Sequence, residues 1–192
     1  LEAYKKRVEM GGWNEEIFYS QYRVGLISAI LKKPHEIIIK EFMEAYSIRP
    51  IRAEPLVEIS RIYRMSDKPA AAFPFARLAA DIPYPANDIL FISEDIYRFG
   101  ALDELGAVAY YAGRPEEGYH ACKKLMEDGR VAPEHLERVQ KNLQQYEQVM
   151  SQIQVNNMQA DMQAQVDKLK KRKQEKELQK TATYKKKKAK SR

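Results

Sequence analysis

Residue types that commonly carry out chemistry are few and scattered in this chain of 192 residues. The three histidines, His35, His120 and His135, fall in different segments, and Cys122 is the only cysteine. His120 and Cys122 stand two residues apart, so a helix would point them in different directions, which argues against a shared metal ion. No glycine-rich phosphate loop, nucleophile elbow or zincin motif occurs. We therefore predict no catalytic, cofactor-binding or metal site, and we interpret Cys122 as a small packing residue rather than a reactive thiol.

Three acidic pairs could supply the two carboxylates that acid–base catalysis uses. They are Glu15-Glu16, Glu94-Asp95 and Glu116-Glu117. Paired catalytic carboxylates must face one cleft, and nothing in the sequence predicts a cleft that any of these pairs shares. We interpret them as charges at helix starts or on solvated faces.

The basic residues gather at the C-terminal end. Residues 168–192 hold 13 lysines and arginines against two glutamates, whereas residues 1–167 carry 20 basic and 25 acidic residues, so the net charge of +6 comes from the tail. Such a tail can attract nucleic acid, an anionic membrane or an acidic protein by releasing counterions, or it can be merely solvated or localising. The candidate polyanion-binding residues are Lys170, Lys171, Arg172, Lys173, Lys185, Lys186, Lys187 and Lys188.

Periodic apolar residues predict helices in consecutive pairs. The pairs cover residues 14–47, 55–81 and 101–128, with turns near Pro34, Asp67 and Gly113. Phe42 and Phe75 are 33 residues apart, as are Pro50 and Pro83, and Cys122 takes the matching place in the third pair. A period of this length is typical of stacked helix pairs. The sequence therefore predicts an all-α, tetratricopeptide-like right-handed superhelix of three helical hairpins, followed by a long C-terminal helix and a basic tail.

Three segments follow from this pattern. Residues 1–12 are a lead-in, residues 13–146 are the helical-repeat domain, and residues 147–192 are a tail rich in glutamine and lysine, either a projecting helix or disordered. Residues 82–100 interrupt the repeat, and we expect an ordered insert there in which residues 89–92 are ambiguous between a strand and a helical turn.

A set of short motifs in the helical region is more distinctive than its periodicity. They are Gly11-Gly12-Trp13, Arg52-Ala53-Glu54-Pro55-Leu56, Ile82-Pro83-Tyr84-Pro85, Asp88-Ile89-Leu90-Phe91-Ile92, Leu102-Asp103-Glu104-Leu105 and Ala109-Tyr110-Tyr111 before Gly113-Arg114. Together they resemble the tetratricopeptide-like region behind the catalytic domain of family 2 glycosyltransferases from bacteria and large DNA viruses. The resemblance implies a parent enzyme that transfers a sugar, with this chain as a helical appendage. The catalytic domain does not carry over, because no Asp-x-Asp pair is present. Pro74 departs from the pattern, since it falls inside a predicted helix.

The tetratricopeptide register also selects a set of groove residues. It places residues from the first helix of each pair on the concave surface, where tyrosine and arginine can bind a protein or peptide. The residues selected are Arg23, Tyr63, Arg64, Asp103, Tyr110 and Tyr111. The alternative is that Tyr63 and Tyr110 only pack between helices, and we favour packing for Tyr110.

These observations lead to two functional hypotheses. The first is a non-catalytic helical-repeat scaffold that mediates protein interaction, and the alternative is an RNA- or ribonucleoprotein-associated subunit that binds nucleic acid through its lysine-rich tail. The single cysteine favours the cytoplasm or another reducing intracellular compartment, with association to a virion or ribonucleoprotein left open. No apolar run approaches the roughly 18 residues of a membrane span. Because the chain begins at Leu1, we interpret it as a fragment or a processed product.

Overall fold

The computed structural model describes residues 1–129 and 131–190, and it describes side chains as far as residue 176. Every regular element in these residues is helical and none is a strand, so the predicted all-α class is confirmed. The chain divides into two compact units, Leu1–Glu147 and Gln148–Arg192, which are described separately. The described part of the second unit is the later part of one long helix.

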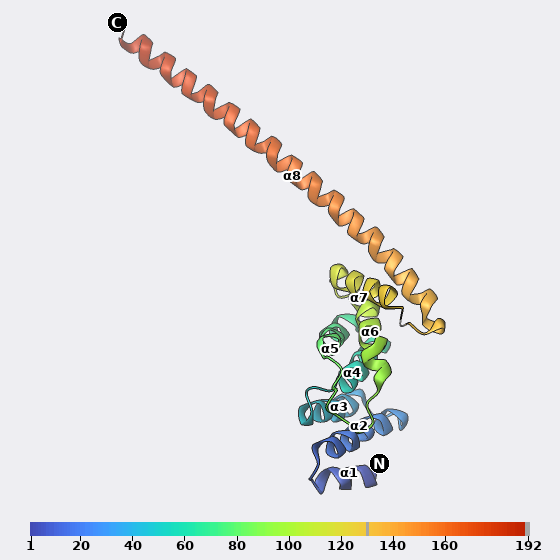
Figure 1. Cartoon of the computed structure of the whole chain (residues 1–192). Helices are drawn as coiled ribbons and strands as arrows, with labels where there is room; N and C mark the ends of the chain where they lie inside the picture. The colour runs from blue at the N-terminus through green and yellow to red at the C-terminus, as the bar shows by residue number, and fades with distance from the viewer. Residues whose placement is uncertain (130, 191–192) are drawn as a thin grey trace. The chain divides into compact units, whose positions relative to one another are not determined.

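Within the first unit, each helix packs mainly against its neighbours in the sequence, and Figure 1 shows α1 to α7 following one another in chain order. The elements are α1 (Glu2–Glu9), α2 (Asn14–Ile30), α3 (His35–Ile48), α4 (Glu54–Met65), α5 (Pro69–Asp81), the π-helix η1 (Ile96–Gly100), α6 (Ala101–Val108), α7 (Pro115–Asp128) and α8 (Pro133–Lys190). The predicted helix pairs are present, and the predicted lead-in contains α1, which packs on α2. Helix α5 starts at Pro69 and continues through Pro74.

The turns between α2 and α3, α4 and α5, and α6 and α7 share one backbone motif. One residue in each takes a left-handed conformation, with φ of 51° at Lys32, 56° at Asp67 and 71° at Gly113. The N–H of the next residue then donates to the carbonyl five residues earlier, over 3.1, 2.9 and 2.9 Å respectively, which makes each turn a Schellman helix end. A proline two residues after the left-handed residue stands at or beside the start of the next helix. These prolines are Pro34, Pro69 and Pro115.

Small residues let the two helices of a pair approach closely. Phe42 of α3 is buried against Gly25 of α2, where a Cβ atom would lie 2.6 Å from the Phe42 ring. In the third pair, a Cβ on Gly106 of α6 would lie 2.6 Å from Sγ of Cys122 on α7. Cys122 is 1% exposed, as the packing interpretation predicted. Phe75 is half-buried and stacks on Tyr63, with ring centroids 5.8 Å apart.

One buried guanidinium connects the insert of residues 82–95 to the helices. Arg52, 1% exposed, stands just before α4 and donates to Glu54 Oε1 over 2.7 Å and to Asp88 Oδ2 over 3.2 Å. It also donates to the carbonyls of Leu90 and Phe91 in the insert, over 3.4 and 3.1 Å. Residues 89–92 are neither strand nor helical turn, and the carbonyls of Leu90 and Phe91 bind a side chain in place of a backbone ladder.

One further carboxylate, that of Glu15, and two side chains, Tyr97 and Arg49, complete this polar centre. Glu54 accepts a hydrogen bond of 2.7 Å from the Tyr97 hydroxyl, and burial, followed by the charge of Glu54, raises the pKa of Tyr97. Glu15 of α2 accepts from the backbone N–H groups of Ile89 and Leu90, both over 2.9 Å. The hydrogen bonds from Arg49 lower the pKa of Asp88 below its usual range. The insert is thus held by charged hydrogen bonds to α2 and to the start of α4.

We expect Arg52→Leu to unfold the first unit more easily, because the change leaves Glu54 buried without its cation and leaves Asp88 with Arg49 alone. Breaking a buried ion pair in this way costs roughly 3–5 kcal/mol in the free energy of unfolding, which urea denaturation followed by circular dichroism measures. Arg98→Leu is the control, since Arg98 forms an exposed pair with Asp95 and its loss costs less than about 1 kcal/mol. Equal unfolding midpoints for the two variants would contradict the central role of Arg52.

Candidate functional site

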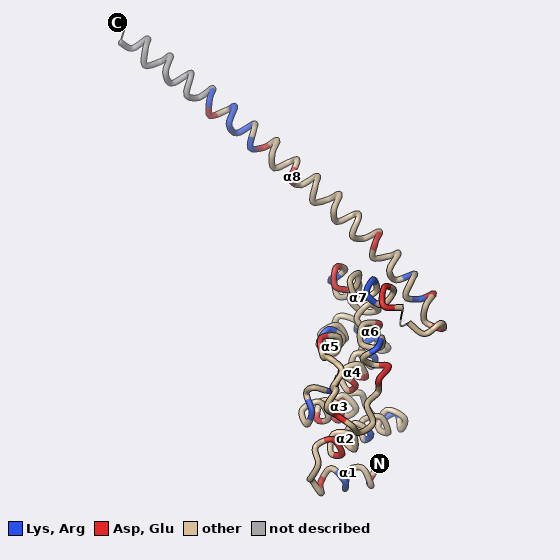
Figure 2. The backbone as a smooth tube through the Cα atoms, in the orientation of Figure 1, with Lys and Arg blue, Asp and Glu red and all other residues tan. Residues whose placement is uncertain are grey.

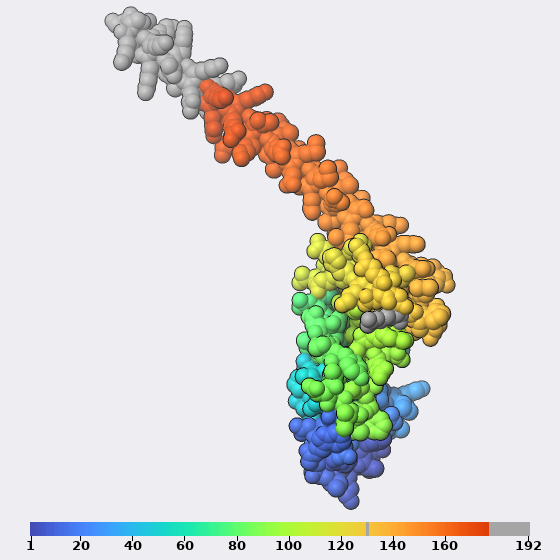
Figure 3. Space-filling model, in the orientation of Figure 1, coloured from blue at the N-terminus to red at the C-terminus, as the bar shows by residue number. Residues whose placement is uncertain are grey.

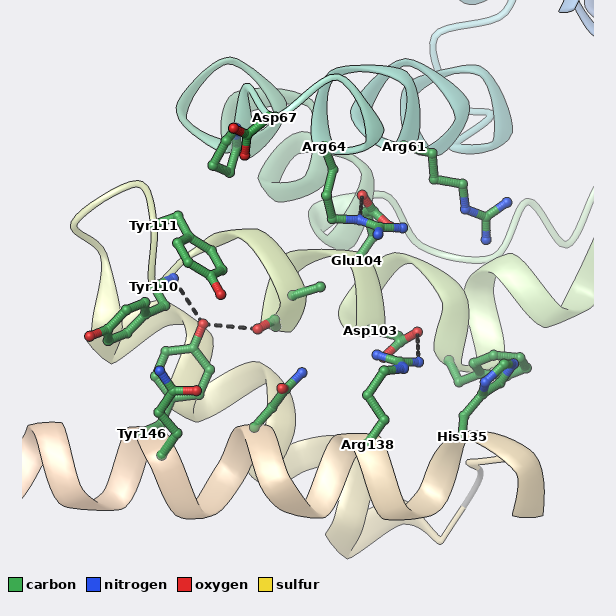
Figure 4. A pocket seen from close by; sticks show the side chains of 16 residues that line it. Arg61, Arg64, Asp67, Asp103, Glu104, Tyr110, Tyr111, His135, Arg138 and Tyr146 are labelled. Carbon is green, nitrogen blue, oxygen red and sulfur yellow. Dashed lines mark hydrogen bonds and ion pairs between the residues drawn. The ribbon is translucent and has the colours of Figure 1, made fainter.

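The first unit contains a groove of about 720 Å³ on one side of α6 (Figure 4). Its walls come from α4 and the turn after it, from η1 and α6, and from the first turns of α8. The lining residues are Arg61, Arg64, Asp67, Pro69, Phe99, Asp103, Glu104, Gly106, Ala107, Tyr110, Tyr111, His135, Arg138, Asn142, Gln145 and Tyr146. The groove therefore joins residues that lie more than 80 positions apart in the sequence.

Two consecutive acidic residues of α6 hold the opposite walls in place. Asp103 pairs with Arg138 of α8 through two hydrogen bonds of 2.9 and 2.8 Å. Glu104 pairs with Arg64 of α4 through bonds of 2.9 and 3.0 Å, and it accepts a third from Ser60 over 3.1 Å. Bidentate arginine–carboxylate pairs fix orientation as well as distance. The hydrogen bonds with Asp103 raise the pKa of the Arg138 guanidinium.

The Tyr146 hydroxyl of α8 occupies a gap in the backbone ladder of α6. It donates to the carbonyl of Gly106 over 2.9 Å and accepts from the N–H of Tyr110 over 2.9 Å. Those two backbone groups are four residues apart and would bond to each other in a continuous helix. We predicted a helix over residues 101–112, and α6 ends at Val108 because a side chain stands in that position. Burial raises the pKa of Tyr146 to about 12.

The interrupted helix leaves two tyrosines at one end of the groove. Tyr110 and Tyr111 are 40% and 66% exposed, and their rings meet edge to face with centroids 5.3 Å apart. Asn142 and Gln145 lie on the same stretch of α8 as Tyr146 and bring amide groups to the groove. Because the arginines already hold carboxylates, the groove offers a ligand hydroxyls, amides and aromatic faces, together with the Asp67 carboxylate and the His135 imidazole.

The structure brings together four of the six predicted groove residues: Arg64, Asp103, Tyr110 and Tyr111. Tyr63 instead stacks on Phe75 between helices. The packing alternative, which we favoured for Tyr110, therefore applies to Tyr63. Arg23 lies on α2 beside the rings of Tyr4 and Tyr19, with its guanidinium carbon 5.8 and 6.0 Å from their centroids, and it does not line this groove.

The wall supplied by α8 was absent from the sequence-based prediction. His135, Arg138, Asn142 and Gln145 recur at spacings of three and four, so they form a polar stripe along one face of this helix. Val139 and Tyr146 of the same segment are buried. A polar stripe beside the buried apolar positions of one helix is the signal that could have identified these residues as part of a site.

Part of the predicted polyanion-binding set lies on the second unit. Lys170, Lys171, Arg172 and Lys173 are all exposed on α8, and the blue segment of α8 in Figure 2 includes them. The side chains of Lys185, Lys186, Lys187 and Lys188 lie outside the described part of the structure.

Other chemistry receives little support from the described residues. Burial, followed by the charge of Asp103, raises the pKa of the Cys122 thiol to about 12, so the group is a poor nucleophile at neutral pH. No three His, Cys, Asp or Glu side chains among these residues gather closely enough to hold a metal ion. The described helices include none with the length and apolar character that crossing a membrane requires.

Comparison with known proteins adds no assignment. The chain matches no protein-family model and no curated protein. The resemblance to glycosyltransferase appendages therefore stays an expectation.

We expect Tyr146→Phe to destabilise the first unit by roughly 1–3 kcal/mol, the usual cost of leaving buried polar groups unpaired. The phenyl ring still fills the gap in α6, so the Tyr110 N–H and the Gly106 carbonyl cannot close on each other. Urea denaturation measures the loss, and faster hydrogen exchange at the Tyr110 amide localises it. Tyr111→Phe, at an exposed tyrosine, is the control and should leave both values unchanged. An unchanged Tyr110 amide in Tyr146→Phe would contradict the role of the hydroxyl.

Proposed function

We propose that this chain is a non-catalytic helical-repeat scaffold whose groove beside α6 binds an extended peptide of a partner protein. The observation that carries the proposal is the set of exposed Tyr110 and Tyr111 with Asn142 and Gln145 around one cavity of about 720 Å³. Tyrosine contributes large contact area at low entropy cost, and side-chain amides can bond to both the N–H and the carbonyl of a peptide backbone.

The charge arrangement favours a peptide over a strongly charged ligand. Arg64 and Arg138 are each held by a bidentate carboxylate, and Arg61 bonds to Glu58 over 2.7 Å. Recruiting Arg64 or Arg138 to an anion would break a pair that also positions a groove wall, and recruiting Arg61 would take it from Glu58 on the same helix. A peptide can use the tyrosines and amides while these ion pairs stay intact.

The shared turn motif supports the tetratricopeptide-like arrangement within this proposal. A left-handed residue, the same backbone hydrogen bond and a proline recur in all three turns, at Lys32, Asp67 and Gly113. The first helix of each hairpin therefore ends in the same way. Equal turns favour equal placement of each helix pair on the next, as in a superhelix with a concave face. An appendage of a glycosyltransferase would use such a face to hold a protein partner.

Selection of peptides from a random displayed library against the full chain tests the groove. We expect the selected peptides to bind Tyr111→Ala and Gln145→Ala at least about fivefold more weakly, since loss of an interface anchor costs more than about 1 kcal/mol. Tyr119→Ala on α7 and Gln144→Ala on α8 are the matched controls, because neither residue lines the groove. Failure to select any peptide, or equal binding by both sets of variants, would contradict the proposal.

The exposed basic run of α8 favours nucleic-acid binding as the second candidate function. We expect the quadruple change of Lys170, Lys171, Arg172 and Lys173 to Gln to weaken binding to single-stranded RNA. The slope of log affinity against log salt should fall by roughly 3, the value for four lost phosphate contacts on a single strand.

The matched control changes four exposed lysines of the first unit to Gln, at Lys40, Lys68, Lys123 and Lys124, and so removes the same charge. Fluorescence anisotropy over a salt series gives both slopes. An equal loss in the two quadruple variants would show attraction by net charge alone, and it would contradict a binding role for this segment.

A further inference from the structure

The second unit carries a narrow apolar stripe along α8. Val155, Met158, Met162, Val166 and Leu169 are 46%, 58%, 64%, 44% and 58% exposed. Their spacings of three and four place them within about 80° of one another around the helix. Every side chain from residue 154 to residue 176 is exposed, so nothing in the described part of the second unit covers the stripe. Figure 3 shows side chains of this stretch, in orange to red, standing free along the helix.

The width and borders of the stripe favour a second helix as its cover. A helix that lies on a membrane presents a broad apolar face with basic residues beside it. Here the apolar face is only as wide as a coiled-coil seam, and Gln152, Gln159 and Gln165 border it. The glutamines are uncharged, so they place no repulsion between two helices that share the seam. A helix without a packed face is also weakly stable in water, which makes a partner helix favourable.

The distribution of charge along this helix indicates which helix can approach and in which direction. Residues 148–160 contain no charged side chain, residues 161–167 contain two aspartates, and residues 168–176 contain six basic residues and one acid. A parallel pair of identical helices would set the basic segments against each other. An antiparallel pair sets each basic segment against the uncharged segment of the other helix.

We propose that a second copy of this chain covers the stripe, as an antiparallel coiled coil centred on Met162. Val155 then faces Leu169 of the second copy, and Met158 faces Val166 of the second copy. The two Met162 side chains meet at the two-fold axis, where flexible thioethers adapt to each other. Lys173 and Lys176 continue the line of the stripe and end the apolar seam, and they meet uncharged residues of the other helix.

Sedimentation velocity on the full chain over a range of concentrations tests the pairing. We expect a dimer for the unaltered chain and a monomer for Met162→Lys and Leu169→Lys, because each buries an unpaired charge in the seam. Ala160→Lys adds the same charge on the opposite face and should remain dimeric. Circular dichroism reports whether each variant keeps its helices. A monomer at every concentration, or equal loss in Ala160→Lys, would overturn the proposal.

Disulfide formation distinguishes the two directions, with Cys122→Ala as the background for each variant. We expect Met162→Cys to cross-link with itself, whereas Val155→Cys and Leu169→Cys cross-link only when the two chains are mixed. Self-linking of Val155→Cys and of Leu169→Cys would show a parallel pair and overturn the antiparallel arrangement. Binding of a monomeric chain to anionic vesicles, lost in Met162→Lys, would assign the stripe to a lipid surface and overturn the proposal entirely.

Discussion

A single buried guanidinium, that of Arg52, determines how the insert of residues 82–95 is joined to α2 and to the start of α4. It needs both Glu54 at the start of α4 and Asp88 in the insert, and its planar face lies 4.5 Å from the ring centre of Phe18 on α2. Removing a charge of this kind from water is costly unless every partner is present, so the three segments are fixed together. The insert then leads directly through η1 into α6, which carries Asp103 and Glu104 to the groove.

The groove depends on α6 in a second way. Two adjacent carboxylates on this short helix reach in different directions, one to α4 and one to α8. Both walls of the groove are therefore held in position by α6. The close approach of Gly106 to Cys122 keeps α6 tight against α7, and Gly118 leaves room for the Tyr146 ring. Small residues at these contacts, together with the three equal turns, are what allow such short helices to pack at close range.

The local elements were predictable because their signals are local. Prolines near helix starts, the Lys33-Pro34-His35 break and the periodic apolar residues indicated every helix pair, and Arg64, Asp103, Tyr110 and Tyr111 followed from the register. What the sequence could not indicate depends on distant contacts. Helix α6 ends at Val108 because the hydroxyl of residue 146 bonds to its backbone. Residues 89–92 have the apolar pattern of a strand, but in the structure Arg52 binds a carbonyl of this segment. Tyr63 and Tyr110 carry the same side chain, and only tertiary packing separates their roles.

The tyrosine hydroxyl within α6 means that the helix and its neighbour compete for the same two backbone groups. If the first turns of α8 were to detach, the Gly106 carbonyl and the Tyr110 N–H could bond to each other, and α6 could continue past Val108. Tyr110 and Tyr111 would then take new positions around the helix axis. Docking exchanges that one internal bond for two, and it also forms the Asp103–Arg138 pair and buries Val139. Ligand binding in the groove and attachment of α8 are therefore thermodynamically linked. A ligand bound there also stabilises the Tyr146 contact with α6 that shapes the groove.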